Sequence, residues 1–155
     1  MKLITDYIEL HVVHFSVTLE HSYLLLKRSD NKPLHPGIWQ MITGAIEDGE
    51  SVKKALVREL KEETGLIAEK IYSLPRVNSF YAEFCDGICL CPVFLAVVNG
   101  NSVCLSDEHS DCKWLGYHEA IKMIRWEDQV VSLEMIEKYL NNKDKLEKLP
   151  QLNFE

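Results

Sequence analysis

Residues 58–65 read RELKEETG, inside a longer stretch, residues 44–66, that reads GAIEDGESVKKALVRELKEETGL. Glu59 is followed by Glu62 and Glu63, three and four residues further along the chain. On a helix, side chains three or four positions apart are neighbours, and like charges placed there repel by about 0.2–0.5 kcal/mol. What this arrangement means therefore depends on which face of the helix the three carboxylates occupy.

The stretch predicts one helix, from Ser51 to Thr64. Ser51 is a suitable N-cap, because its hydroxyl can accept a hydrogen bond from the first turn. Gly65 fits the left-handed residue that commonly follows a helix C-terminus. At about 100° per residue, one arc of the helix is apolar and should face the core. The residues of this arc are Val52, Ala55, Leu56 and Leu60.

The carboxylates are predicted to point inward. Glu59 and Glu63 fall within the apolar arc and Glu62 at its edge, whereas the lysines lie opposite. Carboxylates that face the core need a counter-charge, because burying an unpaired ion is costly. Without a facing basic cluster, their convergence suggests a hard divalent cation with oxygen ligands. Arg58 is expected to orient Glu62 or Glu50 through a forked hydrogen bond. The alternative is an exposed helix end held by Arg58–Glu62 and Lys–Glu pairs.

The flanking sequence predicts a single α/β domain, residues 1–155. Strands are expected at residues 7–18, 22–28, 38–42, 71–81, 88–98 and 112–115, and further helices at 118–124 and 128–140. Loops are expected at residues 31–37 and 43–50, and a tight turn at 99–101. This order predicts a mixed sheet with helices on both faces. The charged tail from about residue 141 is expected to be peripheral.

Composition excludes several classes of protein. The net charge of −7 argues against a basic nucleic-acid-binding surface. No secretory signal is apparent, and no stretch approaches the roughly 20 apolar residues that span a bilayer. The five cysteines lack zinc spacing and are expected to be buried, reduced thiols. A cytoplasmic protein without nucleic-acid or membrane partners is the default expectation.

The whole stretch from Gly44 to Leu66 resembles the signature of the Nudix hydrolase family. That signature is a glycine, five residues, a glutamate, seven residues, and then R-E-aliphatic-x-E-E-x-G-aliphatic, and this sequence matches it without a departure. The matching positions are Gly44, Glu50, Arg58, Glu59, Leu60, Glu62, Glu63, Gly65 and Leu66.

The resemblance implies an α/β/α sandwich with a mixed β-sheet and a catalytic loop–helix–loop. It implies hydrolysis of a nucleoside diphosphate linked to another group, usually with Mg²⁺, for which Mn²⁺ is a possible substitute. The residues that it assigns as metal ligands are Glu59, Glu62 and Glu63, with the carbonyl of Gly44 as a further one. Arg58 and Glu50 resemble the residues that orient those ligands.

Two other stretches resemble one branch of that family, the dihydroneopterin triphosphate and deoxynucleoside triphosphate pyrophosphohydrolases. Upstream, residues 24–44 read LLLKRSDNKPLHPGIWQMITG and are similar to an LLxxR…WQxxTGxxE pattern. Downstream, residues 108–115 read EHSDCKWL and resemble an acidic residue six positions before a tryptophan. On that match, Glu108 is expected to be a further metal ligand or the general base.

Four residues of the upstream stretch are candidate substrate contacts. Lys27 and Arg28 end a predicted strand and are placed to meet phosphates, although a charged strand end in water would look the same. Trp39 and Gln40 combine a stacking surface with an amide that can read the edge of a heterocycle. A tryptophan in the core would give the same pattern.

Other side chains carry weaker signals. Phe80 and Tyr81 are expected to pack within their strand rather than to line a base pocket. His109 and His118 are expected to be surface residues.

Together these features predict a Mg²⁺-dependent pyrophosphohydrolase that converts a nucleoside triphosphate or a pterin triphosphate to a monophosphate and pyrophosphate. Glu108 or a glutamate of the helix would deprotonate the attacking water. The alternatives are a hydrolase of dinucleoside polyphosphates or nucleotide sugars, a nucleotide-sensing domain without turnover, and a metal-stabilised interaction domain. A monomer and a homodimer are both compatible with the sequence.

Overall fold

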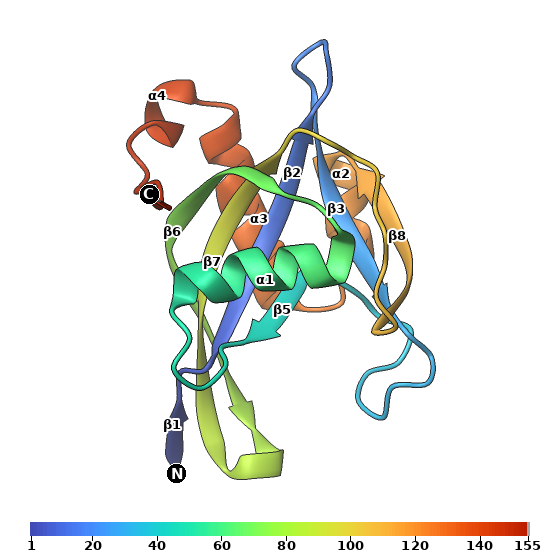
Figure 1. Cartoon of the computed structure of the whole chain (residues 1–155), viewed down its shortest axis with the longest axis vertical. Helices are drawn as coiled ribbons and strands as arrows, with labels where there is room; N and C mark the ends of the chain where they lie inside the picture. Colours follow the sequence, from blue (N-terminus) through green and yellow to red (C-terminus); the bar gives the residue numbers. More distant parts are fainter. Residues whose placement is uncertain (155) are drawn as a thin grey trace.

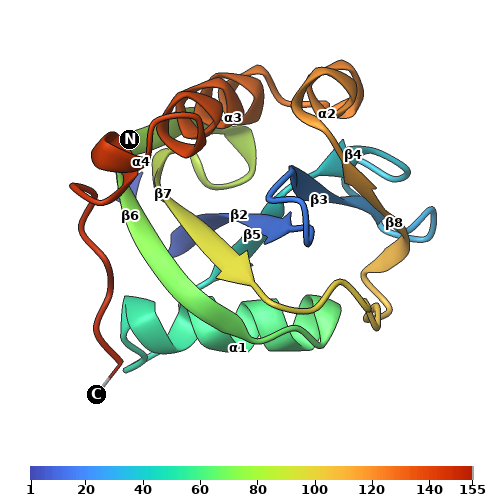
Figure 2. The same cartoon turned by 90° about the horizontal axis from the view of Figure 1, so that it is seen from above.

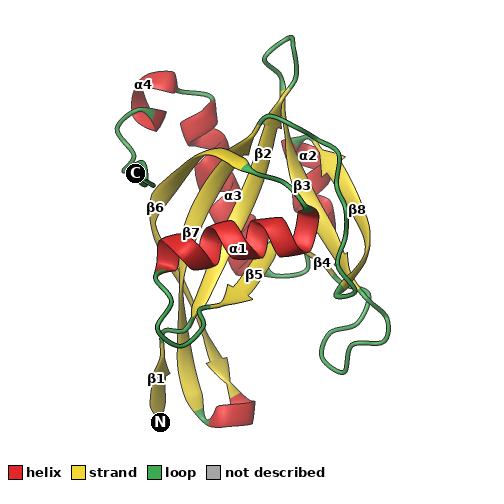
Figure 3. Cartoon of the chain, viewed as in Figure 1, coloured by secondary structure: helices red, strands yellow, loops and turns green. Residues whose placement is uncertain are grey.

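An eight-stranded mixed sheet forms the middle layer of the computed structural model, which describes residues 1–154 (Figures 1 and 3). Strand β2 is central: it runs parallel to β7 and antiparallel to β3 and β5. On either side, β7 pairs with β1 and β6, and β3 pairs with β4 and β8. The strands are β1 (Lys2–Ile4), β2 (Tyr7–Phe15), β3 (His21–Arg28), β4 (Trp39–Gln40), β5 (Ile42–Ala45), β6 (Ala68–Ala82), β7 (Gly87–Val98) and β8 (His109–Leu115).

Helices cover both faces of this sheet, as predicted. Helix α1 lies across one face, and α2 and α3 lie across the other (Figure 2). A short 3₁₀ helix joins β6 to β7, and α4 follows α3. The helices are α1 (Val52–Thr64), the 3₁₀ helix (Glu83–Cys85), α2 (Tyr117–Met123), α3 (Glu127–Leu140) and α4 (Lys143–Leu146).

Strand alternation divides the core into two apolar layers. Successive side chains of a strand point to opposite faces of the sheet. In β2, Ile8 and Leu10 therefore pack with Leu56 under α1, whereas Val13 packs with Leu133 under α3. Each layer fixes one set of helices against the sheet, and the first of them sets the position of α1.

Helix α1 begins and ends where the sequence predicts. The Ser51 hydroxyl accepts a hydrogen bond from Lys54 N at 3.4 Å. Gly65 adopts φ 71°, and its N–H donates to Lys61 O at 2.8 Å. A side chain at that φ would be strained, so glycine ends the helix at low cost.

A buried polar network attaches α3 to the sheet. Asn78 of β6 donates to Glu9 Oε2 at 2.9 Å and to Ser132 Oγ at 3.0 Å. Arg76 donates to the same Ser132 hydroxyl at 2.9 Å, and His11 Nε2 lies 2.6 Å from Glu9 Oε1. Because an unpaired polar group is costly in a core, these contacts fix the register of α3 on β6 and β2.

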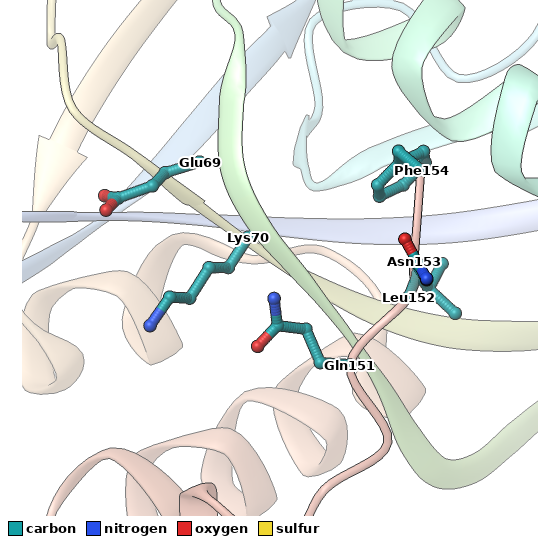
Figure 4. Close-up of a pocket in the computed structure, with 6 residues that line it drawn as sticks. All are labelled: Glu69, Lys70, Gln151, Leu152, Asn153 and Phe154. Atoms are coloured by element: carbon teal, nitrogen blue, oxygen red, sulfur yellow. The ribbon is translucent and has the colours of Figure 1, made fainter.

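The tail lies closer to the core than its charged composition suggested. Leu149 is buried in the layer under α3. Ser73 N donates to Pro150 O at 2.8 Å, and Leu152 N donates to Ile71 O at 2.9 Å, so the tail pairs along β6. Figure 4 shows this part of the tail beside β6, with the residues that line a depression of about 400 Å³. These are Glu69, Lys70, Gln151, Leu152, Asn153 and Phe154.

Several boundaries differ from the sequence prediction. The loop expected at 43–50 begins later, because Thr43, Gly44 and Ala45 pair with β2 as part of β5. The expected tight turn at 99–101 is instead the start of a longer connection that reaches β8 at His109. Strand β1 and helix α4 were not predicted.

The exposure of some aromatic and cysteine side chains also differs from the sequence prediction. Phe80 and Tyr81 are about half exposed, at 48% and 58%, rather than packed. All five cysteines are free thiols, but the expectation that they are buried holds only for Cys89 and Cys91 and is wrong for Cys104, which is exposed. None of the helices in residues 1–154 has the length and apolar character needed to cross a membrane.

Candidate active site on the inner face of α1

The face of α1 that meets the sheet carries two buried carboxylates. Glu59 is 9% exposed and Glu63 is 6% exposed, which confirms that both point inward. Glu62 lies at the edge of this face, and its side chain is 59% exposed. The helix therefore replaces apolar contacts with carboxylates in its second half, as the sequence predicts.

Arg58 holds three carboxylates together. Its Nε and Nη2 donate to the two oxygens of Glu50 at 2.9 and 2.8 Å. Its Nη1 donates to Glu59 Oε1 at 2.8 Å and to Glu62 Oε2 at 3.2 Å, and Nη2 also reaches Ala45 O at 2.8 Å. This fork ties the loop before α1 to the helix and fixes the direction of Glu59.

Gly44 lies directly against the carboxylate of Glu59. A Cβ at Gly44 would stand 2.3 Å from Glu59 Cδ and 2.7 Å from Glu59 Oε1. The Glu59 carboxylate therefore packs on the bare backbone of β5, and a Cβ at this position would force that carboxylate to move.

The titration of these groups reflects burial and the Arg58 fork. Hydrogen bonds from Arg58 and from the Glu47 backbone hold the pKa of Glu50 at about 2. Burial raises the pKa of Glu59 above its ordinary value, against the lowering effect of Arg58, and repulsion by Glu63 adds to the rise. The buried Glu59 carboxylate thus sits where a second cation beside Arg58 would stabilise its charged form.

Glu63 is held by a different segment, the connection between β7 and β8. His109 Nδ1 lies 2.5 Å from Glu63 Oε2, and the Ser106 hydroxyl donates to the same oxygen at 3.2 Å. Burial raises the pKa of Glu63, but contacts with His109, Glu108 and Ser106 lower it below its ordinary value overall. Burial, repulsion by Glu63 and a hydrogen bond shared with Glu63 raise the pKa of Glu108.

Backbone contacts position this connection. Cys104 N donates to Thr64 O at 2.8 Å, which attaches it to the end of α1. Ser29, just after β3, donates from its N to Glu108 O at 2.9 Å and from its hydroxyl to Asp107 O at 2.8 Å. Figure 3 shows the connection running from the end of β7 to the start of β8.

The donor atoms at this site are of the type that binds a divalent cation, although the side chains do not converge on one point. Within residues 1–154, no three His, Cys, Asp or Glu side chains converge into a metal-binding group. The donors are nonetheless oxygen atoms, as Mg²⁺ and Mn²⁺ prefer. Burial raises the pKa of both Glu59 and Glu108. A cation close to these carboxylates would therefore stabilise their charged forms.

The four candidate substrate contacts lie away from this cluster or are engaged elsewhere. Trp39 packs in the layer under α3, on the opposite face of the sheet from Glu59, with Lys113 Nζ 5.2 Å from its ring centroid. Gln40 is buried and accepts from Trp126 Nε1 at 3.3 Å. Arg28 Nε donates to Leu34 O at 2.6 Å, and Lys27 pairs with Trp39 in the β3–β4 register.

Sequence reasoning missed two residues of the cluster and misplaced one. The expectation that His109 is a surface residue is wrong: it is 7% exposed and touches Glu63. Ser106 and Ser29 were not predicted at all, because serines in loops carry no pattern that distinguishes them. The only available signal for His109 was its position next to Glu108.

The Glu50 carboxylate should make stability depend on acidity. Its pKa is lowered from 4.5 to about 2 in the folded chain, so the pair with Arg58 contributes fully above about pH 4.5 and less as the pH falls toward about 2. Glu50→Gln removes this contribution. We expect the difference in Tm between wild type and variant to narrow between about pH 6 and about pH 3. Calorimetry at both pH values checks this, with the exposed Glu119→Gln as control; a constant difference would contradict it.

Comparisons with known proteins agree with this geometry. The NUDIX domain family model matches residues 9–136. A curated nucleoside triphosphatase, NudI of Salmonella arizonae, is 33% identical over 108 residues, which cover 60% of this chain and 72% of that protein.

Solved structures share the fold. A candidate NUDIX hydrolase from Listeria monocytogenes superposes with a TM-score of 0.74 at 24% identity, over 90% of this chain and 96% of that one. The NUDIX domain of Shewanella oneidensis NrtR, crystallised with ADP ribose, gives 0.73 at 19% identity, over 90% of each chain. The matched domain includes α1 and the connection to β8, and the chain belongs to the Nudix hydrolase family.

Proposed function

We propose that this chain is a Mg²⁺-dependent pyrophosphohydrolase that converts a nucleoside triphosphate or a pterin triphosphate to the monophosphate and pyrophosphate. One observation carries the proposal: Glu59 and Glu63 are buried on the inner face of α1, with Arg58 and Glu50 fixing Glu59 from the side. Nudix hydrolases generally use divalent metal ions, and the curated relative named above is a nucleoside triphosphatase.

The proposed ligands of the cation are Glu59, Glu62, Glu63, Glu108 and the carbonyl of Gly44. When bound, the cation would neutralise charge on the phosphate oxygens as water attacks phosphorus, and Mn²⁺ is a chemically suitable substitute for Mg²⁺. Arg58 keeps Glu59 and Glu62 in place through its fork. In this way an acidic protein can hold a polyanionic substrate.

Proton transfer is proposed for the Glu63–Glu108 pair. Each carboxyl group affects the ionisation of the other, and their pKa values are shifted in opposite directions. Such a separation assigns different roles to two neighbouring acids. Glu108, or a glutamate of α1, would accept the proton of the attacking water at a carboxylate oxygen.

The remaining substrate contacts are proposed on β3 and β4. Lys27 and Arg28 would meet phosphates at the end of β3, Arg28 through its terminal nitrogens because Nε is bound to Leu34 O. Trp39 and Gln40 would recognise the base or pterin, and this requires the substrate to reach past the edge of the sheet toward the α3 side. The proposed setting is the cytoplasm, supported by five free thiols.

A hydrolysis panel with mass-spectrometric identification of products tests this function. It includes ribonucleoside and deoxynucleoside triphosphates, dihydroneopterin triphosphate, diadenosine polyphosphates and ADP-ribose, each with Mg²⁺ and with chelator. Pyrophosphate plus a monophosphate from one triphosphate, only with Mg²⁺, is the expected result. Turnover of linked diphosphates alone would overturn the substrate class, and nucleotide binding without turnover would indicate a sensing domain.

A further inference from the structure

The carboxylates of α1 are held by two separate sets of partners. Arg58 contacts Glu50, Glu59 and Glu62. Glu63 is contacted instead by His109 and by Ser106. These residues lie far along the chain, and Ser106 is 43 positions after Glu63. The position of Glu63 therefore depends on residues outside the Gly44–Leu66 signature.

Both of these contacts are made to one oxygen of Glu63. His109 Nδ1 lies 2.5 Å from Oε2, and Ser106 Oγ lies 3.2 Å from the same atom. Anchoring one oxygen fixes the rotation of a carboxylate about its last bond and so sets the direction of the other oxygen. A carboxylate that binds a cation is commonly oriented by such a neighbour.

His109 is itself rigidly placed. It is the first residue of β8 and pairs with Arg28 of β3. Its backbone N–H donates to Ser106 O at 3.3 Å, and the preceding residue, Glu108, accepts from Ser29 N at 2.9 Å. The ring thus approaches Glu63 from a strand end that is fixed on the neighbouring strand.

A packing role alone does not account for this histidine. His109 is 7% exposed. Its Nδ1 lies 2.5 Å from Glu63 Oε2, whereas within the described residues its Nε2 makes no hydrogen bond. Burying such groups without hydrogen bonds is costly, and a leucine would fill the same space without that cost. The feature that a leucine could not supply is the close contact between Nδ1 and Glu63 Oε2.

We infer that His109 is a positioning residue, whose ring holds Oε2 of Glu63 so that the carboxylate is set to bind the divalent cation. The inference rests on the metal site of the proposed function but not on its substrate. His109 does not touch the reacting atoms in this role. It acts through Glu63, with Ser106 as a weaker second support.

The affinity for Mn²⁺ measures this role without any substrate. We compare wild type, His109→Leu, His109→Asn and the control His118→Asn, whose histidine is exposed on α2, by titration calorimetry with MnCl₂. His109→Leu should bind Mn²⁺ about 10- to 100-fold more weakly. His109→Asn can place an amide nitrogen near the position of Nδ1 and should remain within about threefold of wild type. His118→Asn should not change the affinity.

Thermal melts of the same four proteins separate positioning from packing. The inference is overturned if folded His109→Leu binds Mn²⁺ within about twofold of wild type, or if both His109 variants lose affinity equally, in step with Tm. Wild type that binds no Mn²⁺ overturns the inference together with the metal site. Wild type that binds Mn²⁺ but hydrolyses nothing in the panel overturns only the proposed activity, and the comparison of variants then still decides the role of His109.

Discussion

Replacing Glu63 with glutamine should lower turnover by about 10²- to 10⁴-fold and leave the fold almost unchanged. Glu63 is buried, its pKa lies below the ordinary value, and it contacts His109 and Glu108. Glutamine has nearly the same shape but cannot carry the negative charge that a divalent cation requires. Steady-state hydrolysis of the substrate found in the panel, with Tm measured in parallel, provides the test.

A matched control for this variant is available on α2. Glu119→Gln changes the same functional group at an exposed site, where its partner is Lys122, and its turnover should equal that of wild type. Activity of Glu63→Gln within a few-fold of wild type would show that the assignment of Glu63 to the metal site is wrong. A large fall in Tm would instead show that Glu63 is needed for folding.

Replacing Gly44 with alanine should abolish most activity by moving Glu59. The new Cβ would stand 2.3 Å from Glu59 Cδ, and the flexible carboxylate is the group that can move. We expect about a 100-fold loss of turnover and of Mn²⁺ affinity, with a cost of about 1–3 kcal/mol in stability from overpacking. Kinetics, calorimetric titration with Mn²⁺ and denaturant unfolding measure the three quantities.

Gly100→Ala is the control for the glycine substitution, because no atom lies within 4 Å of the added Cβ. It should change neither turnover nor Mn²⁺ affinity. If Gly44→Ala keeps both at wild-type levels, then Glu59 is not held where the site requires it. A loss of stability without loss of Mn²⁺ affinity would have the same meaning.

Features of the site that depend on local sequence were predicted correctly. The cap at Ser51, the helix end at Gly65 and the inward direction of Glu59 and Glu63 all follow from residues close together in the chain. The fork between Arg58 and Glu50 also follows, because the helix brings Arg58 back over the loop that precedes it. Helical periodicity is a strong signal over this length.

Features that depend on strand pairing were not predictable in the same way. His109 meets Glu63 only because β8 pairs with β3 and because Ser29 holds the preceding backbone. The extension of β5 to Gly44 depends on pairing with β2, although threonine, glycine and alanine in a row favour a loop. From its sequence Trp39 could equally have been a core residue or a ligand contact, and in the fold it is partly buried against the layer under α3.

The tail beside β6 has a consequence for how the protein behaves in concentrated solution. An open strand edge exposes unpaired N–H and C=O groups and is a template for pairing with another chain. By bonding to Ile71 and Ser73, residues 150–152 cover that edge where β6 crosses the core. Residues 150–152 thus occupy backbone groups of β6 that could otherwise pair with another chain, and we expect their removal to favour edge-to-edge association.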